Sequence, residues 1–101
     1  MAQLNWTTQS QTDLNNIGRY IANDSVKYAR LQVQKIRNRS RQLVKMPESG
    51  RMVPELGRKD VRELIEGNYR IIYRIKSEEQ IDIITVHHSA RQLNEEKLKQ
   101  E

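Results

Sequence analysis

Apolar residues recur at helical spacing through the first half of the chain. One set follows the spacing i, i+3, i+4, i+7: Leu14, Ile17, Gly18 and Ile21. A second set is spaced 3, 4, 3, 4, 3: Val26, Ala29, Val33, Ile36, Ser40 and Leu43. The two sets predict two antiparallel amphipathic helices, the second running over 26–45, and Gly18 would let them approach closely.

Short polar residues mark where these helices begin. Thr8, with Gln11 three residues later, predicts a capping box at the first helix, and Leu4–Trp6 before it is a short extended segment. Asn23-Asp24-Ser25 interrupts the pattern and supplies a new N-cap. The helical hairpin is therefore expected to turn at 23–25.

The period changes to two after Lys59, which predicts strands. Strands are expected over 61–66, 69–75 and 81–86, with Gly67-Asn68 as the hairpin turn between the first two. The third is apolar on both faces and is expected to be central. Residues 46–60, rich in Pro and Gly, predict an irregular connection. Ser89 with Gln92 predicts a cap for a last short helix to about Lys99.

These elements predict an α+β fold in the order β-α-α-β-β-β-α, forming one domain over residues 1–101. The helical hairpin should pack on one face of an antiparallel sheet. Alternation places Arg70 and Arg74 together on the other face, which we expect to be partly open.

The amino-acid composition limits the kinds of functional site that the chain can form. Cysteine is absent, so disulfides and thiolate sites are excluded, and the only histidines, His87 and His88, are adjacent, which is poor geometry for a zinc ion. The chain has no glycine-rich phosphate loop, no HExxH motif, no apolar run long enough to cross a membrane and no signal-peptide pattern at its start. We expect a small cytoplasmic protein without cofactor or metal.

The positive charge is local. The net charge is +5, yet residues 26–45 carry seven Lys and Arg and no Asp or Glu, leaving 11 basic against 13 acidic residues elsewhere. Such a segment attracts an anionic surface, either nucleic acid or an acidic protein segment. The alternative is a solubilising face on an exposed helix.

Two groups of residues are candidates for target binding. Arg70 and Arg74, joined by Arg62 on the neighbouring strand, suit recognition of phosphate or carboxylate. The alternative is an inter-strand salt bridge, for instance with one of three acids: Glu63, Glu66 or Asp82.

The second group lies where the last strand ends. His87 or His88 is a candidate proton carrier, and Arg91 a phosphate ligand, for RNA cleavage by 2′-hydroxyl attack. A histidine bonded to a backbone carbonyl is the alternative. The aromatic residues are expected in or beside the core, away from the basic run: Trp6, Tyr20, Tyr28, Tyr69 and Tyr73.

Five segments, in this order and spacing, resemble the RelE/ParE toxin superfamily of type II toxin–antitoxin modules, the plasmid stabilisation proteins. They are Pro47-Glu-Ser-Gly-Arg51, Pro54-Glu-Leu56, Val61-Arg-Glu-Leu-Ile65, Gly67-Asn-Tyr-Arg-Ile-Ile-Tyr-Arg74 and Val86-His-His-Ser-Ala-Arg91. The resemblance covers nearly the whole chain and implies the fold reached above. It also implies a cognate antitoxin, small, acidic and partly disordered, in a hetero-oligomer.

The superfamily contains two competing activities. RelE-like members cleave messenger RNA on the ribosome, and Arg70 matches their hairpin arginine, but Val61 and Glu63 stand where that pattern has lysines. ParE-like members lack the catalytic set and poison DNA gyrase, and the spacing from His88 to Arg91 favours them.

The leading hypothesis is therefore a ParE-like gyrase inhibitor with six target-binding residues: Arg62, Arg70, Arg74, His87, His88 and Arg91. The alternative is a ribosome-dependent endoribonuclease using Arg70, His88 and Arg91. A third is a binding module that retains the antitoxin and has lost toxicity.

Overall fold

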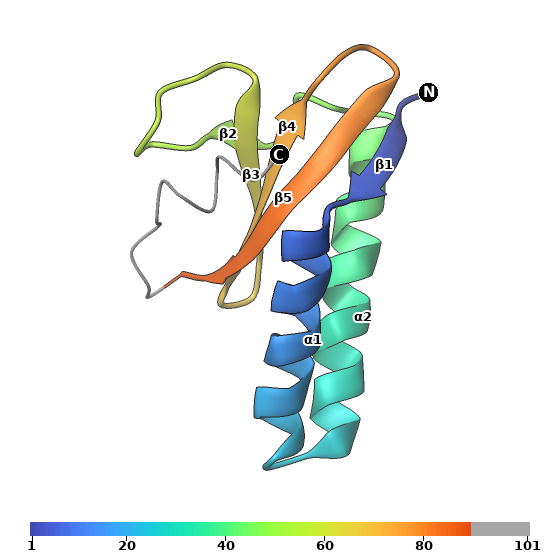
Figure 1. Cartoon of the computed structure of the whole chain (residues 1–101), viewed down its shortest axis with the longest axis vertical. Coiled ribbons are helices and arrows are strands. Elements are labelled where there is room, and N and C mark those ends of the chain that lie inside the picture. The colour runs from blue at the N-terminus through green and yellow to red at the C-terminus, as the bar shows by residue number, and fades with distance from the viewer. Residues whose placement is uncertain (90–101) are drawn as a thin grey trace.

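A five-stranded sheet carries a helical hairpin on one face in the computed structural model, which describes residues 1–89 (Figure 1). The helices and strands are, in chain order, β1 (Gln3–Trp6), α1 (Thr8–Ala22), α2 (Val26–Ser40), the short 3₁₀ helix η1 (Arg41–Val44), β2 (Arg51–Met52), β3 (Val61–Glu66), β4 (Tyr69–Ile75) and β5 (Gln80–His88). The α+β fold and the helical hairpin are confirmed. The helix predicted after Ser89 lies outside the described residues.

The strand order is β1-β5-β4-β3-β2. Strand β5 has a neighbour on each side and is buried from Ile81 to His87, which confirms that it is central. The sheet differs from the prediction at both edges. β1 pairs with β5 in parallel, and β2 pairs with β3 inside the connection that was expected to be irregular.

The helix starts follow local capping chemistry, with one correction. Thr7, and not Thr8, is the N-cap of α1: its backbone is extended and its Oγ1 accepts from the Ser10 N–H. The same hydroxyl donates to the Ile83 carbonyl at 2.7 Å, so the cap also fixes α1 against β5. Ser25 caps α2 as predicted, by accepting from the Tyr28 N–H.

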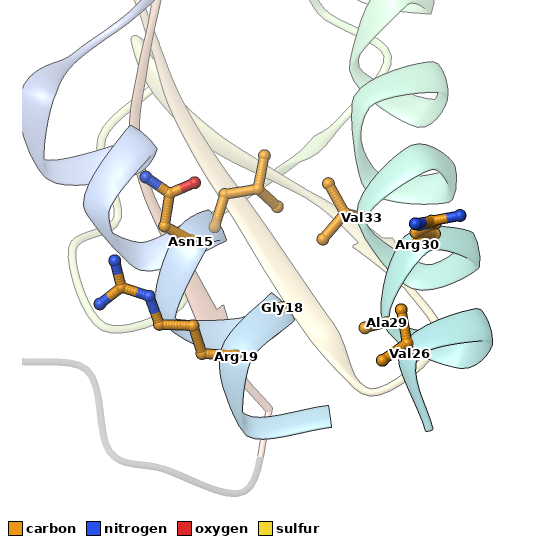
Figure 2. A pocket seen from close by; sticks show the side chains of 8 residues that line it. Asn15, Gly18, Arg19, Val26, Ala29, Arg30 and Val33 are labelled. Atoms are coloured by element: carbon orange, nitrogen blue, oxygen red, sulfur yellow. The ribbon is translucent and has the colours of Figure 1, made fainter. Parts of the chain in front are cut away.

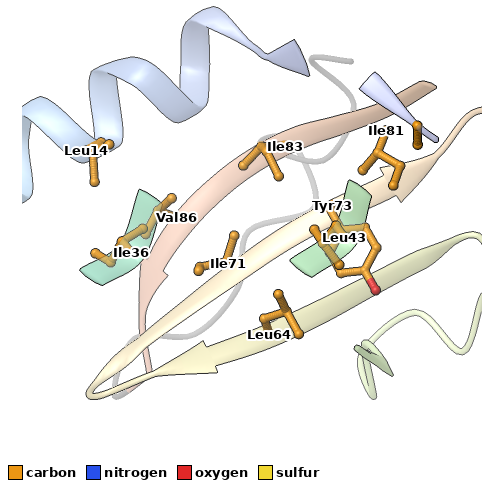
Figure 3. Packing of buried hydrophobic residues seen from close by; sticks show 10 residues of the cluster. Leu14, Ile36, Leu43, Leu64, Ile71, Tyr73, Ile81, Ile83 and Val86 are labelled. Atoms are coloured by element: carbon orange, nitrogen blue, oxygen red, sulfur yellow. The ribbon is translucent and has the colours of Figure 1, made fainter. Parts of the chain in front are cut away.

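Apolar clusters lie on both faces of the sheet. The larger one fills the space between sheet and helices and includes Leu14, Ile36, Ile71 and Tyr73 (Figure 3). The smaller lies on the opposite face, where the connection between β2 and β3 covers the sheet; its members are Val53, Val61, Ile72 and Ile84, with Leu56 packed against them. The second face is therefore partly filled by the chain itself.

Gly18 brings the two helices together, as predicted. A Cβ at this position would lie 3.4 Å from Cγ2 of Val33 on α2. This is an ordinary van der Waals distance, so the helices lie close together at Gly18 and still leave room for a methyl group.

Asp13 closes the edge of β5 where β1 stops. The last pair between β1 and β5 is Trp6 with Ile83. Beyond it, the buried Asp13 carboxylate accepts from the Val86 N–H at 3.2 Å and from the Thr85 hydroxyl. A buried strand edge needs such partners for its N–H groups, so Asp13 has a structural role that the helical pattern alone did not predict.

Candidate target-binding surfaces

The strand register divides the predicted target-binding residues between the two faces of the sheet. Arg70 lies opposite His87, and Arg74 opposite Asp82, on the face away from the helices. Arg62 lies opposite Tyr73, on the helix-covered face. His88 is opposite Tyr69, on that face too. Directly opposed residues share a face, so the expectation that Arg62 joins Arg70 and Arg74 is wrong. Arg91 lies outside the described residues.

Arg70 is held by two carboxylates. Its Nε donates to Glu63 Oε1 on β3 at 2.6 Å. Its two terminal nitrogens donate to the two oxygens of Glu55 at 2.8 and 2.9 Å. Only 10% of the Arg70 side chain is exposed. The inter-strand salt bridge with Glu63, which the sequence left as the alternative, is confirmed.

Arg51 completes this group, which we call the clamp: Arg51, Glu55, Glu63 and Arg70. Arg51 Nε donates to the second oxygen of the fully buried Glu63 at 2.6 Å, so two cations balance two anions. The hydrogen bonds from Arg70 lower the pKa of Glu55 to about 2. The bonds to Glu55 and then to Glu63, partly opposed by burial, raise the pKa of the Arg70 guanidinium. The expected open cationic face is neutral at this point.

Arg74 is also paired, though not with the acid opposite it in the sheet. Its Nε lies 3.3 Å from Asp60 Oδ2, and Arg58 binds the same carboxylate through two nitrogens. Hydrogen bonding by Arg58 holds the pKa of Asp60 below its ordinary value. The residue opposite Arg74, Asp82, instead pairs with Lys76 at 3.5 Å. Arg74 keeps about a third of its side chain exposed.

Arg62 supports the connection between η1 and β3. Its guanidinium donates to the carbonyls of Lys59 and Gly50, each at 3.0 Å. The buried Tyr73 hydroxyl holds the same segment, because it donates to the Pro47 carbonyl at 2.7 Å and accepts from the Gly50 N–H at 3.0 Å. Burial raises the pKa of Tyr73. Arg62 and Tyr73 thus shape the backbone at Gly50.

His87 and His88 do not converge on one site. The side chain of His87 is buried on the face of Arg70. His88 is half-buried on the other face, with its ring edge-on to Tyr69 at a centroid distance of 5.3 Å. Successive residues of a strand point to opposite faces, which separates the two imidazoles. Within residues 1–89, no group of three potential ligands lies close enough to hold a metal ion.

The helical hairpin offers a different surface. A groove of about 440 Å³ lies between α1 and α2 (Figure 2). Leu14, Gly18, Ala29 and Val33 provide apolar contacts in it, and its lining also includes two charged residues, Arg19 and Arg30. The hairpin extends beyond the turn that joins β3 to β4, so its far end stands clear of the sheet (Figure 1). No helix in the described part of the chain is long and apolar enough to span a bilayer.

Two tyrosines expected near the core are exposed on this hairpin. Tyr20 on α1 keeps 75% of its surface accessible and Tyr28 on α2 keeps 67%. The nearby cations Lys27, Arg30 and Lys35 are exposed, and none of the three forms an ion pair with a carboxylate of residues 1–89. Tyr28 falls between positions of the buried stripe of α2, a sign of exposure that was available in the sequence.

Comparison with known proteins settles the family. A model of the ParE toxin of type II toxin–antitoxin systems, parDE, matches residues 4–93. The chain belongs to the ParE toxin family. Membership in it confirms the resemblance on the ParE side and implies a cognate ParD antitoxin as partner of this ParE toxin.

Solved structures agree with this assignment. A chain of the chromosomal ParDE TA system from P. aeruginosa is 25% identical to this ParE toxin, with a TM-score of 0.72. The match covers 87% of this chain and 96% of that chain. No curated protein matches. The fold of the ParE toxin is thus shared over nearly all of the related chain.

Proposed function

We propose that this ParE toxin inhibits DNA gyrase by binding it, without cleaving RNA. The inhibition would block replication in the cytoplasm until the antitoxin, a small acidic protein with a partly disordered segment, binds the toxin in a hetero-oligomer. Family membership supports the toxin role, and the chemistry of the sheet supports a non-enzymatic mechanism.

The clamp around Arg70 is the observation that carries this proposal. A guanidinium that stabilises the transition state of RNA cleavage must present its donors to a phosphate. Here Glu55 takes two of those donors and Glu63 another. The fully buried Glu63 occupies a position where the nuclease pattern has a lysine, so this position supplies no cation to a phosphate.

The two histidines support the same conclusion. A general acid and a general base must both reach the reacting atoms. His87 is buried beside Arg70, whereas His88 lies on the opposite face. The alternative nuclease set of Arg70, His88 and Arg91 therefore has Arg70 and His88 on different sides of the sheet.

Gyrase assays test the proposal directly. We expect purified toxin to inhibit supercoiling by gyrase at stoichiometric amounts and to trap a cleavage complex on DNA. Arg74 and His88 keep part of their surface exposed and are the proposed contacts among the described residues. Arg74→Ala and His88→Ala should each weaken inhibition severalfold, while the exposed control Lys59→Ala should not.

The competing activity is measured in parallel. Toe-printing of messages in a translating extract should show no toxin-dependent cleavage. Cleavage that disappears in His88→Ala, together with unchanged supercoiling, would overturn the proposal in favour of the nuclease. Loss of viability on expressing the toxin alone distinguishes both from a binding module without toxicity.

A further inference from the structure

A row of basic residues runs along the outer side of helix α2 and onto the first residue of η1. We call it the basic stripe: Lys27, Arg30 and Arg37 on α2 and Arg41 on η1, with Gln34 between Arg30 and Arg37. The spacing 3, 4, 3, 4 keeps these positions on one side of a helix. At 1.5 Å per residue the row spans about 21 Å. All four cationic residues are exposed.

No acidic side chain in the described part of the molecule pairs with the positive charges of the basic stripe. None of its four cations forms an ion pair there, whereas Arg51, Arg58, Arg70, Arg74 and Lys76 all do. No acidic residue occurs anywhere from Val26 to Lys45. The charges of the stripe are therefore available to an external anion.

The stripe extends beyond the groove between α1 and α2. Among stripe residues the groove lining includes only Arg30, and its α2 residues end at Val33. A short acidic segment lying in the groove would leave Arg37 and Arg41 without a partner. A ligand that engages the whole row must carry closely spaced negative charges over about 21 Å, and duplex DNA carries one charge per about 1.7 Å of its axis.

Trp6 holds the side chain of Arg37, one of the stripe cations, in position before a ligand binds. The Arg37 guanidinium carbon lies 5.3 Å from the centroid of the Trp6 ring, which is a cation–π contact. This contact restrains the long side chain and lowers the conformational entropy lost when Arg37 binds a phosphate. Trp6 is also the sole tryptophan of the chain, so its fluorescence reports on Arg37.

We propose that the basic stripe of α2 binds the phosphate backbone of duplex DNA without sequence preference. This DNA-binding role rests on the proposed function and deepens it, because an inhibitor that traps gyrase on DNA is held beside a duplex. Contact with that DNA adds to the contact with the enzyme and slows release of the trapped complex.

Salt dependence of binding to a short duplex is the decisive measurement. A labelled duplex of about 20 bp is titrated with toxin, and anisotropy and Trp6 fluorescence are both recorded. Four phosphate contacts predict a fall in affinity of about 150-fold between 50 and 200 mM salt. The double variant Lys27→Gln/Arg30→Gln retains two contacts and should fall only about 12-fold.

A matched control removes the same charge elsewhere. Lys35→Gln/Lys59→Gln takes one cation from another side of α2 and one from the sheet connection, so it should keep the steep salt dependence of the wild type. Circular dichroism melts verify that all variants are folded. Equal salt slopes for the two double variants, or no binding at 50 mM salt, would overturn the proposal.

Poly-glutamate separates DNA from an acidic protein ligand. The proposal expects duplex DNA to bind at least tenfold more tightly than poly-glutamate of equal charge; comparable binding assigns the stripe to an acidic protein and rejects DNA. Supercoiling assays distinguish the two proposals. Gyrase inhibition without DNA binding would reject the DNA-binding role of the basic stripe and leave the proposed function intact. DNA binding without gyrase inhibition would reject the proposed function and leave the role of the stripe intact.

Discussion

Arginines on the sheet and arginines on the helical hairpin have opposite surroundings. On the sheet, Arg70 has 10% of its side chain exposed and is bound by Glu55 and Glu63. On the hairpin, Arg30 is exposed and forms no ion pair with any acid of residues 1–89. The same residue type therefore holds the fold together in one region and remains available to a partner in the other.

This difference shows how to interpret basic residues in a small toxin. A buried charge must be paired, because an unpaired one costs several kcal/mol. An exposed charge costs little to leave unpaired and contributes little to stability. Pairing with an acid thus separates the arginines that hold the fold, including the exposed Arg51, from those that remain open to a target, and four predictions test this division.

Loss of Glu63 should have the largest effect. Glu63→Ala leaves Arg70 and Arg51 without their shared buried carboxylate, and we expect a loss of about 3 kcal/mol in the free energy of unfolding. Urea denaturation measures it. Glu66→Ala, on the same strand and partly exposed, should change stability by less than about 0.5 kcal/mol. Similar losses for both variants would contradict the structural role of the clamp.

Substitution of one glycine beside the sheet and one on the hairpin should have the next largest effects on stability, in opposite directions. A Cβ at Gly50 would lie 2.5 Å from the Glu63 carbonyl oxygen and 2.7 Å from the Tyr73 hydroxyl, so Gly50→Ala should cost about 2 kcal/mol. On the hairpin, Gly18→Ala makes only an ordinary contact with Val33 and gains helix propensity, so it should stabilise by about 0.5 kcal/mol. Thermal melts show whether each variant is stabilised or destabilised. Destabilisation by Gly18→Ala would show that the two helices cannot adjust to the added methyl group.

The clamp should also respond to pH. The folded pKa of Glu55 is about 2, below its ordinary 4.5, so its ion pair contributes fully above pH 4.5 and is lost as the pH falls towards 2. The difference in stability between wild type and Glu55→Gln should therefore shrink over this range. Denaturation at several pH values measures it, and a difference that stays constant from pH 5 to pH 2.5 would refute the pairing.

Removal of the hairpin cations should have the smallest effect on stability. Lys27→Gln/Arg30→Gln breaks no ion pair among the described residues, so the free energy of unfolding should change by less than about 0.5 kcal/mol. Chemical denaturation beside the wild type measures it. A loss above 1 kcal/mol would place these cations in the same class as Arg70.

The sequence predicted the helices and central strands well, because their apolar spacing reports directly on the face that each element buries. Val61–Glu66 and Tyr69–Ile75 have the predicted bounds. It did not predict β2, whose two residues are too few to show a period. It also did not predict that β1 is parallel, because a four-residue strand carries no signal of its direction.

The candidate site was harder to predict than the fold. Alternation correctly placed Arg70 and Arg74 on one face, but Glu55 reaches Arg70 from a connection whose path no periodicity describes. The register between β3 and β4 was needed to show that Arg62 lies on the other face. Charge counting did identify 26–45 as the source of the positive charge, and the structure adds that these cations form no ion pair with an acid of residues 1–89.

The pairing of β1 with β5 has a consequence for synthesis of the toxin. Gln3 pairs with Gln80, and Thr7 contacts the carbonyls of Ile83 and Ile84. Strand β1 therefore cannot join the sheet until β5 has been synthesised. During translation the helical hairpin emerges long before the strand that fills the middle of the sheet. A nascent chain halted before residue 80 lacks the contribution of Ile81, Ile83 and Val86 to the larger apolar cluster. We therefore expect premature termination to yield fragments that do not fold into a toxin.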